Sequence, residues 1–279
     1  MSVACPMRPA FRFSFVAISL LALTATSFAE DTNCVISDRQ KGDKVELIAR
    51  LKNLSDVTID VSLKLVNMRC NKKIPFRTVI KSEGSHVLFE LSPIHPNREW
   101  KYHYEFAWKS GHNLVGKPKA FFYRLPYLRF KSRVTQGPYG TFSHGTGSQD
   151  EEAIDFLMPV GTKLCAARAG RVIGLRSDAT LGGVNKKFKK DFNYVLIRHD
   201  DGTFAEYAHL KHDGVFVKIG QEVKEGDAIG LSGNTGFTSS PHLHFSVFYT
   251  VSGSKRITIP VTFKSAYGNH FKPVQGGIY

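Results

Sequence analysis

Short segments in which apolar and polar side chains alternate recur along most of this 279-residue chain. A period of two places the apolar side chains on one face of a β-strand, whereas an amphipathic helix needs a period near 3.6. Polar residues, Gly, Pro and Asn separate the segments, and no long amphipathic helical pattern occurs between them. Four such segments are KVELIARLKN, TIDVSLKLVNM, SHVLFEL and WKYHYEFAWK. The chain is therefore predicted to be all-β.

The strand-like segments fall into two groups, which predict two domains. Residues 30–120 predict a small β-sandwich with an accessory role. Residues 121–139 are rich in proline and aromatic residues and predict a connecting segment. Residues 140–279 predict a second, antiparallel domain, in which NYVLIRHDDGTFAEYAHL forms a hairpin around an Asp-Gly turn.

The first 29 residues have the layout of a secretory signal peptide. Arg8 and Arg12 precede a mostly apolar run over 13–23, and Ser-Phe-Ala ends at Ala29 as a small-x-small cleavage site. The apolar run is too short to favour a membrane span, although an uncleaved anchor is the alternative. We expect cleavage near Ala29 and export to the periplasm or the medium, with no transmembrane segment after processing.

The chain is strongly basic, with a formal net charge of +14. Removal of the leader lowers this charge to +12, because residues 1–29 contain two arginines and no acid. A basic exported protein is attracted to anionic envelope polymers. No nucleic-acid-binding motif occurs, so nucleic acid is not expected as a partner. The densest basic run, NKKFKKDF over 185–192, is either a solvated loop or a binding element.

Three cysteines follow the predicted leader. An oxidising compartment would permit a bridge between Cys34 and Cys70. Cys165 lies among apolar residues in GTKLCAARAG, which predicts a buried side chain rather than a reactive thiol.

The segment SSPHLHFSVF places two histidines two positions apart. In a strand, His242 and His244 would share one face, while Leu243, Phe245 and Val247 would pack on the other. Two imidazoles on one face indicate either a metal site or a pair of surface histidines with their own hydrogen-bond partners. The dipeptide spacing alone leaves both interpretations open.

Further polar residues in the C-terminal half favour the metal site. His144 follows GTFS, Asp155 lies in AIDFLMPVGT, and His209 ends the strand TFAEYAHL. Catalytic zinc takes three protein ligands from His and Asp or Glu and keeps a fourth position for water. One carboxylate and two histidines leave net positive charge at the zinc, and two histidines remain for acid–base chemistry.

Three motifs, taken in order, resemble those of the lysostaphin-type (LytM-domain) zinc endopeptidases of bacterial cell walls. They are SH…AIDFLMPVGT, YVLIRHDDGTFAEYAHL and IGQEVKEGDAIGLSGNTGFTSSPHLHF. The resemblance runs from about 140 to 248 and implies an antiparallel β-sheet that lines a groove. It implies one Zn²⁺ ion bound by His144, Asp155 and His244. It also implies that His209 and His242 are the catalytic histidines.

Two departures from the family pattern matter. The family commonly separates the first His and the Asp by four positions, whereas Asp155 lies eleven after His144. The segment GTGSQDEEA therefore predicts an inserted loop. Asp150, within this loop, is a rival metal ligand. If Asp155 binds the metal instead, we expect Asp150 to be a solvated loop acid. Ser240 stands where the family usually has Gly.

Three more polar side chains of the C-terminal half are not assigned to the metal site. We interpret His199 and His212, each before a turn, as local hydrogen-bonding residues. Strand alternation places Tyr207 on the same face as His209, so it lies either in the groove or in the core.

The predicted function is that of an exported zinc metalloendopeptidase, a hydrolase of peptide bonds in peptidoglycan cross-links or stem peptides. The main alternative is a catalytically inactive LytM-type regulator that binds and activates another cell-wall hydrolase. A third possibility is a wall-binding module whose sandwich carries the function.

Overall fold

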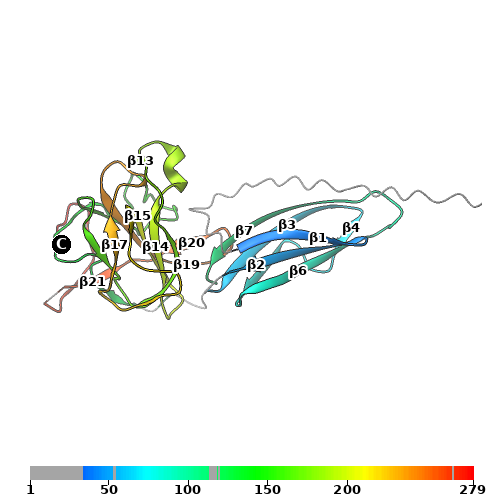
Figure 1. The fold of residues 1–279 in the computed structure, drawn as a ribbon, viewed down its shortest axis with the longest axis horizontal. Helices are drawn as coiled ribbons and strands as arrows, with labels where there is room; N and C mark the ends of the chain where they lie inside the picture. Colours follow the sequence, from blue (N-terminus) through cyan, green and yellow to red (C-terminus); the bar gives the residue numbers. More distant parts are fainter. Residues whose placement is uncertain (1–33, 53–54, 113–117, 119, 266) are drawn as a thin grey trace, which may run out of the picture.

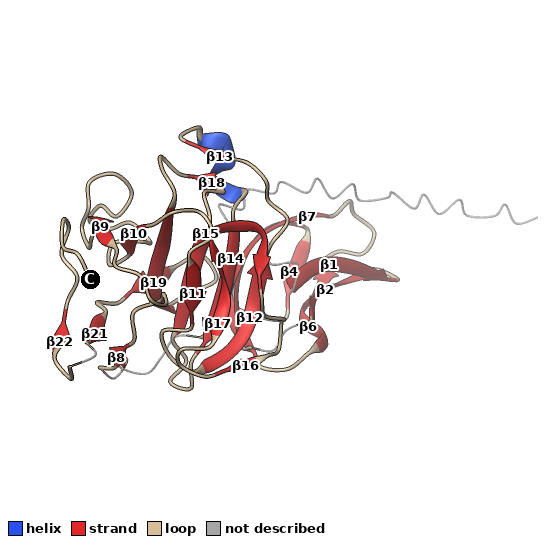
Figure 2. Ribbon diagram, turned by 60° about the vertical axis from the view of Figure 1, so that its left-hand side comes forward, coloured by secondary structure: helices blue, strands red, loops and turns tan. Residues whose placement is uncertain are grey.

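The computed structural model describes residues 34–52, 55–112, 118, 120–265 and 267–279. Within these residues it contains 22 β-strands and a single 3-10 helix, η1 (Lys186–Lys190), which confirms the all-β prediction. Figures 1 and 2 show two strand-rich bodies, with η1 beside the short strands β13 and β18. No helix of the described residues has the length and hydropathy needed to cross a membrane. The predicted signal peptide lies outside the described residues.

The N-terminal part is a sandwich of two antiparallel sheets, as predicted. One sheet has the order β1-β2-β6-β4 and the other has the order β5-β3-β7. Their apolar faces form one core around Ile59, Val61, Phe89 and Leu91. The strands are β1 (Cys34–Lys41), β2 (Lys44–Leu51), β3 (Val57–Val66), β4 (Met68–Cys70), β5 (Phe76–Ile80), β6 (Gly84–Pro93) and β7 (Lys101–Ser110).

The strand register excludes the expected bridge between Cys34 and Cys70. Cys34 lies in the row of Gly84 on β6, because both pair with Leu51. Cys70 pairs with Leu91, seven residues further along β6. At about 3.4 Å per residue, the two cysteines lie roughly 24 Å apart along the strands. A disulfide needs Cα atoms within about 7 Å, so the expectation was wrong.

The C-terminal part is built on one large antiparallel sheet, as the resemblance implied. Its path is β16-β12-β14-β15-β19-β10-β9, with β11 and β17 joined beside β15 and with β20 joined to β19. The strands are β9 (Arg133–Gln136), β10 (Ile154–Leu157), β11 (Lys163–Cys165), β12 (Gly170–Arg176), β14 (Asn193–Arg198), β15 (Phe204–Val215), β16 (Glu222–Val223), β17 (Ala228–Ser232), β19 (His242–Thr250) and β20 (Arg256–Thr258).

Two small sheets complete this part of the chain. Strands β13 (Gly182–Gly183) and β18 (Gly236–Phe237) pair in parallel near η1. Strands β8 (Phe122–Tyr123), β21 (Thr262–Lys264) and β22 (His270–Phe271) form the other sheet. Residues 121–139 thus contribute β8 and β9 to C-terminal sheets. The domain boundaries at 120 and 139 stay predictions.

One face of the large sheet covers the C-terminal core. Phe156 from β10, Tyr207 from β15 and Leu243, Phe245 and Val247 from β19 are all fully buried there. Cys165 is also fully buried, as predicted. The apolar residues of β19 therefore take the predicted inner face, and its histidines take the opposite face.

The two parts touch where β7 ends and the turn between β19 and β20 begins. Thr250 Oγ1 donates a hydrogen bond to the carbonyl of Ser110 at 2.5 Å. The backbone N–H of Gly253 donates to Asp60 Oδ2 at 3.1 Å. The sandwich therefore contacts the strand pair that carries His244 and Arg256.

Candidate active site

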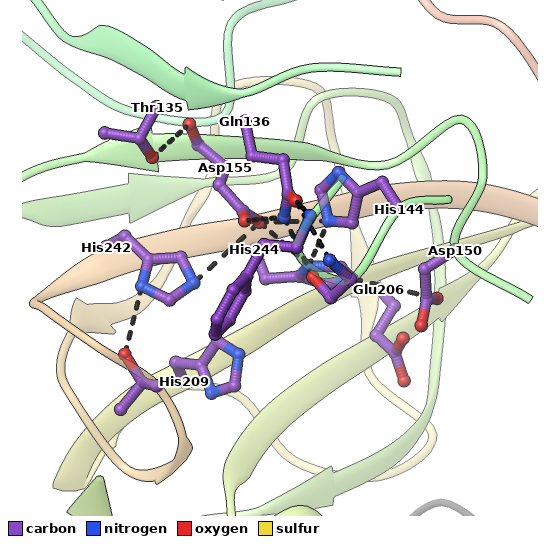
Figure 3. A network of polar contacts seen from close by, with 12 residues as sticks. Thr135, Gln136, His144, Asp150, Asp155, Glu206, His209, His242 and His244 are labelled. Carbon is purple, nitrogen blue, oxygen red and sulfur yellow. Dashed lines mark hydrogen bonds and ion pairs between the residues drawn. The ribbon is translucent and has the colours of Figure 1, made fainter. Parts of the chain in front are cut away.

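A polar row crosses the outer face of the large sheet. Asp155 on β10 pairs directly with His244 on β19, and Gln136 on β9 pairs with Asp155. His242 lies two residues from His244 along β19, opposite Leu157. Because pleated strands point alternate side chains to one face, the register brings His242, His244 and Asp155 together. Figure 3 shows their side chains gathered on this face with His144.

His144, Asp155 and His244 form a set that could hold a metal ion. His144 Nε2 lies 3.4 Å from His244 Nδ1 and 3.4 Å from Asp155 Oδ1. Asp155 Oδ1 lies 2.9 Å from His244 Nδ1. Ligands about 2.1 Å from a tetrahedral zinc ion are separated by about 3.4 Å. The three donor atoms therefore fit zinc.

Hydrogen bonds to the backbone and to Gln136 orient two of these three side chains. His144 Nδ1 lies 3.1 Å from the carbonyl oxygen of Gly137, which can only accept, so Nδ1 carries the proton. The lone pair of Nε2 then points toward Asp155 and His244. Gln136 Nε2 donates to Asp155 Oδ2 at 2.9 Å, which leaves Oδ1 directed at the histidines.

The charges of the site favour an ionised Asp155. Burial acts to raise its pKa, but its contacts with the imidazoles of His144 and His244 hold the pKa well below its usual range. Burial acts in the opposite sense on His244, and its bond to Asp155 raises the pKa of His244 to about 9. Without a metal, a proton on His244 neutralises the carboxylate at this position.

His209 and His242 lie beside this set and face each other, with ring centroids 4.7 Å apart. Each Nδ1 lies 2.7 Å from a backbone carbonyl oxygen, that of Thr235 for His209 and that of Ser240 for His242. Both Nδ1 atoms therefore donate, and both Nε2 atoms are acceptors in the neutral rings. Burial lowers the pKa of His209 to about 3 and also lowers the pKa of His242.

A β-bulge turns His209 toward the site. Asn193 pairs with Leu210 and Tyr194 pairs with Ala208, which leaves His209 without a partner in the ladder. Its φ of 64° lies in the left-handed region, an uncommon conformation for a residue with a side chain. Simple alternation had placed Tyr207 on the face of His209, and this was wrong. The fully buried Tyr207 hydroxyl instead accepts from Ala167 N–H at 2.7 Å.

Asp150 lies in a buried ion-pair cluster. Arg256 Nη2 donates to Asp150 Oδ1 at 2.5 Å, and Arg256 Nη1 donates to Glu206 Oε2 at 3.0 Å. Only 16% of the Asp150 side chain is exposed, so the expectation of a solvated loop acid was wrong. The physical reason is Arg256, whose buried guanidinium requires carboxylate partners. Burial acts to raise the pKa of Asp150, but the charge of Arg256 lowers it.

The same cluster lies next to His244 of the metal set. His244 Nε2 lies 3.9 Å from Asp150 Oδ1, and Asp150, Glu206 and His244 form a second set that by distance alone could bind a metal. Arg256, however, already binds both carboxylates. Asp155 contacts the site histidines and no arginine among the described residues, so it is the better carboxylate ligand.

A groove of about 700 Å³ opens over the site. Phe142, two residues before His144, stacks on Phe237 at 5.8 Å with the ring planes 4° apart. The groove lining includes four of the predicted site residues, the aromatic residues Phe142, Phe192 and Phe237, and Lys186 and Lys189 of η1. Asp150, Glu206, Arg256 and several Ser, Thr and Gln residues also line it.

Two other histidines lie outside the groove lining. His199 is buried, and its Nδ1 donates to the carbonyl of Ala169 at 2.8 Å. Burial lowers its pKa to about 4. His212 pairs with its neighbour Asp213 at 3.2 Å. The contact of His212 is local, as expected, whereas the partner of His199 lies 30 residues earlier in the chain.

Sequence reasoning missed Gln136, Glu206 and Arg256. Besides its bond to Asp155, Gln136 accepts through Oε1 from the N–H groups of Phe142 and Ser143. Gln136 thereby holds the loop that carries His144 against the strand that carries Asp155. An amide in VTQGPYG has no local signal for this role, because its partners lie up to 19 residues away.

Comparison with known proteins agrees with this geometry. Residues 149–256 match the family model described as Peptidase family M23. This stretch of the C-terminal part is therefore similar to M23 peptidases. The resemblance to lysostaphin-type peptidases is thereby confirmed. The matched residues begin after His144, so they contain four of the five predicted site residues.

Several curated relatives match part of this chain. An uncharacterised metalloprotease of Buchnera aphidicola is 31% identical over 49% of this chain and 33% of its own length. The peptidoglycan DD-endopeptidase ShyA of Vibrio cholerae is 39% identical over 33% of this chain and 19% of its own length. The glycyl-glycine endopeptidase ALE-1 of Staphylococcus capitis is 32% identical over 47% of this chain and 34% of its own length. The chain therefore spans about a third or less of these relatives.

Among solved structures, the catalytic domain of lysostaphin from Staphylococcus simulans is 29% identical to this chain. The match covers 47% of this chain and 88% of that domain, with a TM-score of 0.33.

Proposed function

We propose that this protein is an exported zinc metalloendopeptidase that hydrolyses peptide bonds in peptidoglycan cross-links or stem peptides. The observation that carries the proposal is the spacing of His144 Nε2, Asp155 Oδ1 and His244 Nδ1, which fits the ligands of a tetrahedral zinc ion. The M23 match and the names of ShyA and ALE-1 support the reaction class.

In this proposal His144, Asp155 and His244 bind one zinc ion. Bound there, Zn²⁺ would polarise the carbonyl oxygen of the scissile bond and lower the pKa of a water molecule. Gln136 and the backbone carbonyl of Gly137 hold two ligands in the orientation that binding requires. The proposed ligand set leaves the fourth position to water and substrate.

His209 and His242 are the proposed acid–base pair. Their Nδ1–H groups are held by backbone carbonyls, so each ring presents an unprotonated Nε2 as a base. Their lowered pKa values keep both rings neutral at physiological pH. One imidazole takes a proton from the water molecule that attacks the peptide carbonyl. The pair then stabilises the oxyanion or protonates the leaving amine.

Export is part of the same proposal. It rests on the leader-like sequence of residues 1–29, with the mature chain beginning near Glu30, and on a substrate that lies outside the cytoplasm. The positive net charge would favour contact with anionic envelope polymers.

Purified protein tests the function directly. Zinc content is measured by elemental mass spectrometry, and intact cell-wall sacculi are incubated with the zinc-loaded protein. We expect one zinc ion per chain and the release of cross-link or stem peptides. Bound zinc without any cleaved peptide would favour the inactive-regulator alternative instead.

A further inference from the structure

The basic run predicted as either a solvated loop or a binding element lies at the groove. Lys186 and Lys189 of η1 line the same groove as His209 and His242. Both lysines are exposed, so their ammonium groups are accessible to a ligand in the groove.

Several contacts fix η1 in place. Asn185 caps its first turn, because Asn185 Oδ1 accepts from Lys187 N–H at 3.0 Å. At the other end, Arg176 binds Asp191 at 2.6 Å and donates to the carbonyl of Lys190 at 3.2 Å. The two groove-facing lysines therefore extend from an anchored turn rather than from a loose loop.

The same turn is joined to the catalytic wall of the groove. Lys189 Nζ lies 5.6 Å from the ring of Phe237, which stacks on Phe142 near the metal set. Phe192, two residues after η1, packs against His209 with ring centroids 5.7 Å apart. A peptide bound beside His209 would therefore lie close to the η1 lysines.

The charges along the groove are segregated. Its acidic lining residues are Asp150, Asp155 and Glu206, and all three are largely buried and paired with Arg256 or the site histidines. Among the described residues, neither Lys186 nor Lys189 forms an ion pair with an acid. The groove thus presents two accessible positive charges and no exposed carboxylate at the wall formed by η1.

We propose that Lys186 and Lys189 form a subsite for a free carboxylate carried by the peptide substrate close to the scissile bond. This inference rests on the proposed peptidase function and names its substrate class. The acidic residues of peptidoglycan stem peptides provide such carboxylates, whereas a glycine bridge has none in its side chains. The subsite makes a charged stem-peptide cross-link a better substrate than a neutral glycine bridge.

Matched peptides test the subsite. One cross-linked peptide dimer carries a free carboxylate on the residue next to the cleaved bond, and its counterpart carries the amide there. For the zinc-loaded protein, we expect a higher kcat/KM for the carboxylate form. The K186A/K189A variant should lose about fivefold in kcat/KM on the carboxylate form through a higher KM, as for exposed charge pairs, and should no longer prefer that form over the amide. Added salt should reduce the wild-type preference.

A control variant comes from the same turn. K187A/K190A removes equal charge from η1 at two lysines that do not line the groove. It should retain the wild-type preference for the carboxylate form. An equal loss of preference in both variants would show an effect of net charge alone and would overturn the subsite.

Binding separates this inference from the function on which it rests. Titration of both peptides into the metal-free protein measures the carboxylate preference without any hydrolysis. Preferential binding that depends on Lys186 and Lys189, without cleavage by the zinc-loaded protein, would support the subsite and contradict the peptidase function. Equal binding and equal cleavage of the two peptides would overturn the subsite alone. If K186A/K189A lost binding to anionic wall polymer but bound and cleaved both peptides as wild type does, that result would also overturn the subsite.

Discussion

At the scale of single residues, Asp155 and Asp150 distinguish a metal ligand from a structural acid. Asp155→Ala removes one of three zinc ligands, so this variant should lose zinc and activity. Asp150→Ala should keep zinc, because Asp150 lies against Arg256 rather than within the metal set. It should instead lower the free energy of unfolding by about 1–3 kcal/mol, since a buried guanidinium loses a charged partner.

Metal analysis and denaturant unfolding of the two purified variants check these outcomes. Asp150→Asn is the control, because it keeps the shape and a hydrogen-bond acceptor for Arg256. Zinc lost from the Asp150 variants but kept in Asp155→Ala would mean that the carboxylate ligand has been assigned to the wrong aspartate.

His199 should make folding sensitive to mild acid. Its pKa is about 4 in the folded protein, because burial disfavours the charged ring, against about 6.5 in an unfolded chain. Between pH 6.5 and pH 4 the unfolded chain binds a proton that the folded protein does not bind, so stability falls as pH falls. We expect His199 to account for roughly 2 kcal/mol of the loss between pH 7 and pH 5.

The check is a comparison of wild type with His199→Asn, which keeps an N–H donor for the carbonyl of Ala169 but does not titrate. Denaturant unfolding at the two pH values gives the stability change for each protein. The same acid-induced loss in both proteins would exclude His199 as its source.

The histidine positions on β19 were predictable because alternation in SSPHLHFSVF is regular and the strand has one buried face. The direction of the His209 side chain was not predictable, because a β-bulge at that residue breaks the alternation of side chains along β15. The partners of Arg256 also had no sequence signal. Asp150 lies 106 residues earlier, and only the fold brings the two together.

At the scale of structural elements, Gln136 connects three pieces of the site. Its side chain holds Asp155 on β10 and the N–H groups of Phe142 and Ser143, which precede His144. Gln136→Leu removes these bonds while keeping a side chain of similar size. We expect zinc affinity to fall by about 10- to 100-fold, as for other groups that orient metal ligands.

Competition with a zinc-binding dye measures that affinity without any enzyme assay. Gln136→Glu is an informative companion, because it keeps an acceptor for the loop but places a second carboxylate beside Asp155. Unchanged affinity in Gln136→Leu would mean that the packing of β9 and β10 alone orients Asp155.

The segment between His144 and Asp155 illustrates what an insertion pattern can predict. Its length and its glycines correctly indicated irregular chain rather than a strand. They did not indicate that Asp150 is anchored by Arg256 of β20. A local pattern reports backbone preference, whereas this anchor depends on tertiary contact.

At the scale of the whole molecule, the sandwich contacts the strands that carry the site. The backbone of Gly253, in the turn between β19 and β20, lies against Ala107 and Asp60 of the sandwich. Burial lowers the pKa of Lys109 on β7 to about 8, and the charge of Arg256 acts in the same sense. The sequence predicted both parts of the chain, but not this contact.

Gly253→Val tests the contact, because any Cβ at this position would overlap the backbone of Ala107 and Asp60. We expect a loss of roughly 1–3 kcal/mol from overpacking, with the two parts unfolding in separate transitions. Differential scanning calorimetry resolves the transitions. Gly145→Val, at a position where a Cβ meets no atom within 4 Å and φ is not positive, is the control. A single unchanged transition in Gly253→Val would show that the contact contributes little.

The central claim is that zinc at His144, Asp155 and His244 acts with His209 and His242 to cut peptidoglycan peptides. Mass spectrometry of the peptides released from sacculi tests it most directly, with zinc-loaded wild type compared with zinc-loaded His209→Ala and with His244→Ala. We expect wild type to release peptides with new ends. His209→Ala should keep its zinc but lose about 10²- to 10⁴-fold in cleavage rate, and His244→Ala should show neither zinc nor cleavage. Near-normal cleavage by His244→Ala, or loss of zinc from His209→Ala, would contradict it.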